Sequence, residues 1–188
     1  KKYKDVKVIA IDFTPTDEKD NPVDIAKNVY CATYKEQQPG YLAGYAAVKD
    51  GYTKIGFMGG MALPAVINYG YGFLQYNSGT EVIFSCGGQI CNSVFAAAED
   101  TNKKSIGVDS DQKDDSKTVI TSAMKGVKQT VFDEITNAYN DKFEGGAHLL
   151  GAEDDYAGLS SDFSRLKKFK KADYNKVFKE VKDGKIKI

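Results

Sequence analysis

Short apolar runs alternate with longer segments of helical periodicity along most of this chain. Val6 to Ile11 is β-branched and nearly continuous, which is typical of a strand buried on both faces of a sheet. The longer segments place apolar residues three or four positions apart, as in a helix with one buried side. We therefore expect strands over 6–11, 28–34, 54–58, 80–85, 105–108 and 147–150, and helices over 39–50, 64–75, 92–99, 114 or 116 to 139, and 173–182.

The order of these elements predicts an α/β fold. Strands that alternate with helices form parallel sheets covered on both faces. Ligands of such folds bind beside the carboxyl ends of the strands. Three expected loops at those ends are rich in glycine or aspartate, namely Gly59-Gly60-Met61, Gly87-Gly88-Gln89 and Asp109-Ser110-Asp111. We expect a ligand site where these loops converge.

Composition narrows the class of protein. The 188 residues are enough for one sizeable domain or two small lobes, and a hydrophobic content of 41% argues against disorder. Basic and acidic residues both total 26, and this balance argues against a nucleic-acid partner. The apolar runs are only as long as strands, far below the roughly 20 residues that span a bilayer. We expect the lysines between Lys167 and Lys187 to lie on a solvated helix face.

The glycine pairs have two interpretations. Glycine after a strand permits positive φ and lets a ligand or another backbone approach closely. The alternative is a tight turn without a ligand. Neither the pair with Gly60 nor the pair with Gly88 fits GxxxxGK[ST] or GxGxxG, so we do not expect a site for nucleotide phosphates.

Three charged residues are candidates for ligand contacts. A carboxylate at a strand end, such as Asp109 or Asp111, can accept hydrogen bonds from two adjacent hydroxyls, as in ribose recognition. The alternative for both aspartates is an Asx turn or a helix cap. Lys125 falls in the second turn of the long expected helix, where it is either a surface lysine or a partner for a nearby carboxylate.

Catalytic and metal chemistry find little support in the sequence. Cys31, Cys86 and Cys91 form no CxxC pair, and His148 is the only histidine, so we expect no metal site. No GxSxG, HExxH or paired-carboxylate motif is present. We therefore expect no catalytic residues, no cofactor and no enzymatic activity.

Several motifs, in order, resemble those of one family. They are Tyr34-Lys35-Glu36-Gln37-Gln38-Pro39-Gly40-Tyr41-Leu42-Ala43-Gly44; Ile55 to Met61 with Pro64 and Gly72-Phe73; Val82-Ile83-Phe84 with Gly87-Gly88 and Val94 to Ala98; Gly107 to Gln112; and Thr121 to Lys125. Together they resemble the basic membrane lipoproteins (BMP, PnrA-like family), which are substrate-binding proteins of ABC importers. The resemblance runs through nearly the whole chain.

This resemblance implies a periplasmic-binding-protein fold of type I, in which the ligand lies between two Rossmann-like lobes. It implies that a purine nucleoside is captured by lobe closure, with no bond made or broken, and is delivered to an ABC importer permease. It also implies an extracytoplasmic lipoprotein of the cell membrane, whose lipid anchor is not in this chain, and we expect a monomer. Carried over by motif, Asp109 would hold the ribose hydroxyls, Lys125 would lie near the same end, and Gly88 would let its backbone approach the ligand. Gly60 and Asp111 would be neighbours of the site.

The same resemblance suggests the domain organisation. We expect residues 1–50 to form a partial amino-terminal lobe and a hinge segment, 51–150 a carboxyl-terminal Rossmann-like lobe, and 151–188 a return crossing and a final helix. Family chains are longer: their opening region and one strand–helix unit after residue 75 have no counterpart here, so the fold is expected to be incomplete. Two explanations stay open, namely that the sequence joins segments between which residues are left out, or that it is a shortened version.

Two other functions stay open. One is a ligand-sensing regulator of the same fold, and the other is an α/β enzyme that acts on nucleosides.

Overall fold

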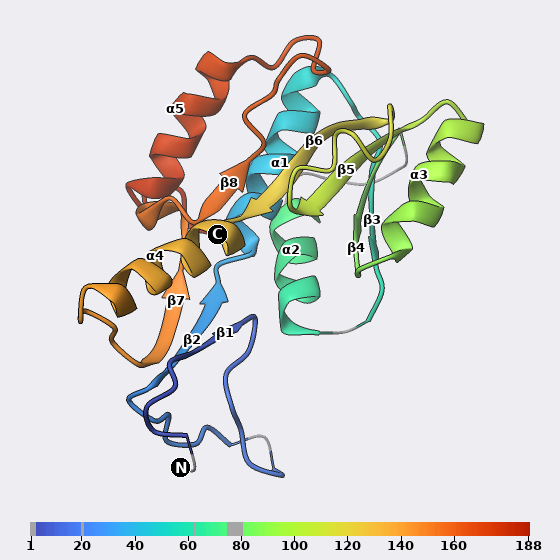
Figure 1. Ribbon diagram of the computed structural model, residues 1–188. Helices are drawn as coiled ribbons and strands as arrows, with labels where there is room; N and C mark the ends of the chain where they lie inside the picture. Colours follow the sequence, from blue (N-terminus) through green and yellow to red (C-terminus); the bar gives the residue numbers. More distant parts are fainter. Residues whose placement is uncertain (1–2, 20, 62, 75–80) are drawn as a thin grey trace.

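The computed structural model describes residues 3–19, 21–61, 63–74 and 81–188 (Figure 1). Its strands are β1 (Val8–Ile11), β2 (Val29–Tyr34), β3 (Ile55–Gly59), β4 (Val82–Cys86), β5 (Lys104–Asp109), β6 (Val119–Lys125), β7 (Gly146–Leu150) and β8 (Ala157–Leu159). Its helices are α1 (Gln37–Asp50), α2 (Pro64–Leu74), α3 (Ile90–Asp100), α4 (Val127–Tyr139) and α5 (Lys171–Lys182), with a short 3-10 turn, η1 (Ala152–Asp154). Residue 75 of the expected helix 64–75 and residue 80 of the expected strand 80–85 lie outside these ranges.

The strands form two sheets. One has the order β1-β2-β7 and is parallel throughout, and the other has the order β3-β4-β5-β6-β8. In the second sheet β3 to β6 are parallel, whereas β8 runs antiparallel to β6. The expected α/β fold with parallel sheets is thus confirmed, and β8 is an addition that its three residues were too few to signal.

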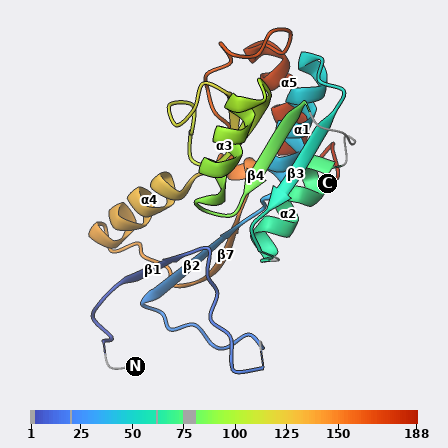
Figure 2. The same ribbon diagram turned by 90° about the vertical axis from the view of Figure 1, so that its right-hand side faces the viewer.

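The five-stranded sheet is the centre of the larger unit. Helices α1, α2 and α5 lie on one of its faces, and α3 lies on the other (Figure 2). Fully buried side chains from helices and strands fill the first interface, among them Leu42 of α1, Phe73 of α2 and Phe84 of β4. Phe95 of α3 packs against Val119 on the second face. Burial on both faces explains why these strands have continuous apolar runs.

The three-stranded sheet is the centre of the smaller unit. Ile9, Tyr30 and Leu150 gather on one face of this sheet and pack against Val127 at the start of α4. In Figure 1 the small sheet and α4 lie below the large sheet.

The chain passes between the two units three times, after β2, after β6 and after β7. The first and third crossings are bonded to each other. The backbone N–H of Lys35 donates to the carbonyl of Leu150 (2.9 Å), and that of Ala152 donates to Oε1 of Gln38 (2.7 Å). Lys35 also forms an ion pair with Glu153. These contacts hold the first and third crossings side by side between the units, and we refer to this pair of crossings as the hinge.

These sheets group the chain differently from the ranges 1–50, 51–150 and 151–188. Helix α1 packs against α2 and the large sheet, although it falls in the first range. Strand β7 pairs with β2 of the small sheet, although it falls in the second.

The expected long helix ending near Tyr139 is wrong in its first half. Residues 119–125 form strand β6, and the helix begins only at Val127. The apolar spacing of Ile120, Met124 and Val127 imitates a helical stripe, but almost every residue of β6 is buried because both faces of the strand are covered. Lys125 therefore lies at a strand end and not in a helical turn.

None of the helices in residues 3–19, 21–61, 63–74 and 81–188 is both long and apolar enough to cross a membrane.

Candidate functional site

A cavity of about 1070 Å³ lies between the two units, at the carboxyl ends of their strands. Of the three loops expected to converge, those with Gly60-Met61 and Gly87-Gly88 line the cavity, and the third contributes Asp109. The lining residues are Asp12, Phe13, Thr14, Thr33, Tyr34, Glu36, Gly60, Met61, Leu63, Pro64, Ala65, Val66, Asn68, Tyr69, Cys86, Gly87, Gly88, Ile90, Asp109, Lys125 and Leu149. Both sheets therefore supply walls of the same cavity.

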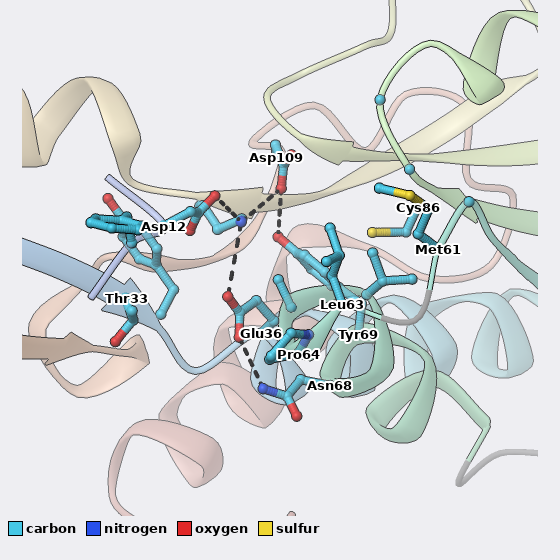
Figure 3. Close-up of a pocket in the computed structure, with 18 of the residues that line it drawn as sticks. Asp12, Thr33, Glu36, Met61, Leu63, Pro64, Asn68, Tyr69, Cys86 and Asp109 are labelled. Carbon is cyan, nitrogen blue, oxygen red and sulfur yellow. Dashed lines mark hydrogen bonds and ion pairs between the residues drawn. The ribbon is translucent and has the colours of Figure 1, made fainter. Parts of the chain in front are cut away.

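The ammonium group of Lys125 is the centre of the polar end of this cavity. Its Nζ lies 2.7 Å from Oδ2 of Asp12, 3.3 Å from Oδ1 of Asp109 and 3.9 Å from Oε1 of Glu36 (Figure 3). The rings of Tyr34 and Tyr69 flank it, each with its centroid 5.6 Å away. One cation thus holds carboxylates from both units and from the hinge.

Asp12 and Asp109 occupy equivalent places in the two sheets. Asp12 follows the last residue of β1 and Asp109 ends β5, and both have left-handed backbones, with φ of 55° and 66°. This conformation is uncommon outside glycine and concentrates at functional sites. Their side chains are 40% and 52% exposed, so both carboxylates keep acceptor positions open to the cavity.

Burial and charge act in opposite directions on the ionisation of this cluster. Burial lowers the pKa of Lys125, but the charges of Asp109 and Asp12 outweigh it and leave that pKa above its ordinary value. Burial also raises the pKa of Glu36, which Lys125 and a hydrogen bond from Asn68 (3.2 Å) only partly offset. Lys125 therefore stays protonated at neutral pH beside Asp12 and Asp109.

The wall beside Asp109 is aromatic and apolar. The hydroxyl of Tyr69 donates to Oδ1 of Asp109 (3.2 Å), and its ring meets Phe84 edge to face. Cys86 lies in the same wall, where burial above all raises the pKa of its thiol to about 12. A thiol with that pKa is protonated at neutral pH and is no nucleophile.

The glycine pairs divide between the two interpretations. Gly60 and Gly87 pack backbone against backbone: a Cβ on Gly87 would lie 2.7 Å from the Cα and the nitrogen of Gly60. Gly88 differs, because it has a φ of 62° and an added Cβ would meet nothing within 4 Å. The close approach of the Gly87 backbone thus accounts for a glycine at position 60, which also lines the cavity. At Gly88 the backbone is open to the cavity.

Asp111 lies elsewhere. Its Oδ2 accepts from the hydroxyl of Ser160 (2.6 Å), its Oδ1 accepts from the backbone N–H of Lys113 (3.2 Å), and it is not among the lining residues. The structure therefore brings together Asp109, Lys125, Gly88 and Gly60, and gives Asp111 a role in tying two loops.

Three side chains at the polar end of the cavity were not among the site residues predicted from the sequence, namely Asp12, Glu36 and Tyr69. Asp12 follows an expected strand, as Asp109 does, which was a usable signal. Glu36 and Tyr69 gave none, because a carboxylate at a hinge and a tyrosine in an amphipathic helix are common in any α/β protein.

Metal chemistry has no candidate in the part of the chain that the structure describes, where no three His, Cys, Asp or Glu side chains are placed to hold an ion. His148 stacks on Tyr30 in the small sheet, with ring centroids 4.1 Å apart.

Several relatives match this chain. The protein named CD4+ T-cell-stimulating antigen of Listeria monocytogenes is 28% identical over 220 aligned positions, which cover 90% of this chain and 62% of that protein. The ABC transporter nucleoside-binding protein BmpA of Lactococcus lactis subsp. cremoris is 29% identical over 178 positions, covering 68% and 51%. This chain thus spans between half and two thirds of the length of these relatives. The Listeria alignment is longer than the 188 residues available here, so that relative has residues with no counterpart in this chain.

Solved structures agree on the fold. An ABC transporter solute-binding protein from Aeropyrum pernix K1 superposes with a TM-score of 0.76 at 18% identity, covering 99% of this chain and 71% of that one. A transcriptional activator of the comK gene from Bacillus halodurans gives a TM-score of 0.74 at 15% identity, covering 97% and 70%. The fold is therefore that of the periplasmic binding proteins.

The family model described as ABC transporter substrate-binding protein PnrA-like matches residues 1–75 and 74–188. The two matched pieces meet where a strand–helix unit of the family is expected to have no counterpart in this chain. With the interlobe cavity and the binding-protein fold, this match shows that the chain belongs to the PnrA-like family of ABC transporter substrate-binding proteins.

Proposed function

We propose that this protein captures a purine nucleoside in the cavity between its two units and delivers it to an ABC importer. The observation that carries the proposal is the contrast between the two ends of that cavity. One end holds the carboxylates of Asp12 and Asp109 around a buried ammonium group, and the remaining wall is largely apolar.

The acidic end suits the sugar of a nucleoside. Oδ1 of Asp109 forms an ion pair with Lys125 and accepts a hydrogen bond from Tyr69, which leaves the second oxygen of Asp109 for vicinal hydroxyls. Hydrogen bonds to a charged acceptor contribute about 1.5–3 kcal/mol each. The apolar side chains of Phe13, Met61 and Leu63 offer a surface for the base. The name of the Lactococcus relative as a nucleoside-binding protein supports the same class of ligand.

The charge of the site favours a neutral ligand. Three carboxylates share one ammonium group, so a phosphate would meet a net negative surface at this end. No glycine-rich phosphate loop offsets that charge. Nucleosides therefore fit the cavity better than nucleotides.

The mechanism is closure and release. Because the cavity is lined from both units and the chain crosses between them at a hinge, a ligand that contacts both walls stabilises the closed arrangement. No bond is made or broken. We further propose that the complete protein is an extracytoplasmic lipoprotein, held to the cell membrane by a lipid anchor outside this chain, and that it acts as a monomer.

Isothermal titration calorimetry with guanosine, adenosine and inosine tests the ligand. We expect Asp109→Asn to weaken binding about 10- to 100-fold, because a charged acceptor is lost. Asp111→Asn is the matched control, since Asp111 bonds Ser160 and does not line the cavity. Absence of heat with all three nucleosides at millimolar concentration, or tighter binding of their monophosphates, would overturn the assignment.

A ligand-sensing regulator is the second candidate, because the same fold occurs in the comK activator. At 15% identity that likeness concerns the fold alone. A nucleoside-processing enzyme is the third, and chromatography of inosine or adenosine incubated with the protein tests it: an unchanged nucleoside argues for binding without turnover.

A further inference from the structure

Charge is unevenly distributed along this neutral chain. From Arg165 to the last residue the sequence has ten basic and three acidic residues, whereas residues 1–164 have 16 basic and 23 acidic ones. Such segregation exceeds what an ordinary solvated helix face requires, since those faces usually mix both signs. The excess positive charge is thus concentrated in α5 and the loop that enters it.

Some of these cations have partners in the fold. Nη1 of Arg165 donates to the carbonyls of Lys113, Ser116 and Val119 at 2.8–2.9 Å. Lys179 and Lys185 pair with Asp183, and Lys182 pairs with Asp155. The basic patch consists of the exposed lysines at the end of α1, in the loop before α5 and at the start of α5 that form no ion pair within the described ranges, namely Lys49, Lys167, Lys168, Lys170 and Lys171. Lys176 and Lys187 are exposed too, but they lie farther along α5 and after it.

The fold presents these lysines on an ordered platform. Leu166 and Phe169 are each 1% exposed, so the sequence Leu-Lys-Lys-Phe-Lys-Lys turns its apolar residues inward and its lysines outward. The buried carboxylate of Asp50 accepts the backbone N–H groups of Lys168 and Phe169, the latter at 3.0 Å. This contact ties the loop to the end of α1 and brings Lys49 beside it.

The stability of α5 does not explain why lysines stand at its amino-terminal end. Lys170 and Lys171 lie there, although the helix dipole favours acidic residues at that end. Asp173 is the one acidic residue of that first turn, and it accepts the backbone N–H of Lys170 (2.9 Å). The remaining positive charge is unfavourable in the free protein, and an anionic surface would relieve it.

We propose that the basic patch docks this protein on anionic phospholipid headgroups. Lysine is a mobile point charge that suits a fluid array of phosphates, whereas recognition of a fixed partner favours the forked geometry of arginine, and the patch has none. Stacking on nucleic-acid bases is disfavoured because Phe169 is buried and Tyr174 is largely covered. Clusters of four to eight basic residues on or beside a helix are typical of this mode of membrane contact.

Docking would leave the ligand cavity open. The patch adjoins Arg165, which binds carbonyls just before β6 and at its first residue, and therefore lies at the amino end of that strand. Lys125 and the cavity lie at its carboxyl end. In Figure 1 the loop that enters α5 is at the top and the small sheet is at the bottom. This inference goes beyond the proposed nucleoside binding and does not depend on it.

Co-sedimentation with vesicles tests the proposal. We compare phosphatidylcholine vesicles with vesicles in which roughly one third is phosphatidylglycerol, in low salt and in physiological salt. The variant Lys167→Gln, Lys168→Gln, Lys170→Gln, Lys171→Gln removes four charges of the patch. The matched control Lys4→Gln, Lys27→Gln, Lys128→Gln, Lys142→Gln removes four exposed lysines from outside the patch.

We expect binding only to the anionic vesicles, weakening as salt is added. Each lysine near such a surface contributes about fivefold, so the patch variant should bind up to several hundredfold more weakly, and the control should keep most of its binding. Circular dichroism checks that both variants fold. Equal loss in the two variants, or equal binding to neutral vesicles, would overturn the proposal. Binding to polyglutamate without binding to either vesicle would assign the patch to an acidic protein and also overturn it.

Discussion

Replacing Lys125 with methionine tests whether the cavity cluster is held together by its single cation. Methionine has nearly the length of lysine without its charge, and the Lys125 side chain is only 2% exposed, so packing is largely kept while the ion pairs are lost. Removing one partner of a fully buried pair costs about 3–5 kcal/mol. Here Asp12 and Asp109 are about half exposed and regain water, so we expect a loss of about 2–3 kcal/mol in the free energy of unfolding at neutral pH.

The pH dependence of Lys125→Met gives a second test. Without the ammonium group, the pKa of the Glu36 carboxyl, which burial already raises, rises further because the favourable charge of Lys125 is lost. A carboxyl with a raised pKa contributes stability that is present below its unfolded pKa and is lost as the pH rises through the folded pKa. The deficit of the variant should therefore be larger at about pH 8 than at about pH 4. The wild type behaves differently, since the raised pKa of Lys125 adds stability that is lost only above the ordinary lysine value of 10.5.

Urea denaturation followed by circular dichroism measures both effects, because the chain has no tryptophan. Lys128→Met is the control, since Lys128 is exposed at the start of α4 and should change stability by less than about 0.5 kcal/mol. If Lys125→Met were as stable as this control at neutral pH, or lost more stability at acid than at alkaline pH, the electrostatic account of the cluster would be refuted.

Three further predictions concern single residues. Burial above all raises the pKa of Glu36, so its ionisation costs stability as the pH rises; Glu36→Gln should be more stable than the wild type at about pH 8, with the gain vanishing at about pH 4 in thermal melts. Gly87→Ala should lose at least about 2 kcal/mol in urea denaturation because its Cβ would overlap the Gly60 backbone, whereas Gly88→Ala should lose only about 1 kcal/mol from its left-handed φ; equal losses would contradict the close approach. Desolvation raises the pKa of Glu153, but hydrogen bonds from Lys35 and Gln38 outweigh it and hold that pKa below its ordinary value. Glu153→Gln should therefore lose about 0.5–1 kcal/mol of unfolding free energy at neutral pH and low salt, and the loss should fade as acid protonates the wild-type carboxyl. A loss that persists in acid would contradict the ion pair.

The strand–helix alternation was predictable from the sequence because strands buried on both faces leave continuous apolar runs. Strand β6 was not predictable, because its continuous apolar run lacks the apolar–polar alternation of a half-buried strand. The spacing of its apolar residues also continues into that of α4, so the two elements look like one helix. Gly126 and the β-branched start Val119-Ile120-Thr121 were the signals that separated them. The misassignment did not remove Lys125 from the candidates, since the family resemblance selected it independently of its local structure.

Family resemblance aside, the candidate site was predictable only where a residue lies at the end of a strand that the sequence marks clearly. Asp109 and Gly88 follow such strands and line the cavity. Asp111 follows the same strand two residues later, and its position depends on the turn and on Ser160, which lies far along the chain. The contribution of Glu36 depends on which hinge segments meet, and no local pattern encodes that.

The three-stranded sheet has a consequence for how the protein folds. Its strand β2 pairs Tyr30 with Gly146 of β7, and the whole five-stranded sheet except β8 is encoded between them. Closing so long a loop is entropically unfavourable until the intervening residues have become compact. We therefore expect the large unit to fold first and to bring β7 within reach of β2, so that the cavity that both sheets enclose is completed last. Slow folding steps should then be seen as delayed protection of β2 and β7 amides, and destabilising the large unit should delay formation of the binding site even when no lining residue is changed.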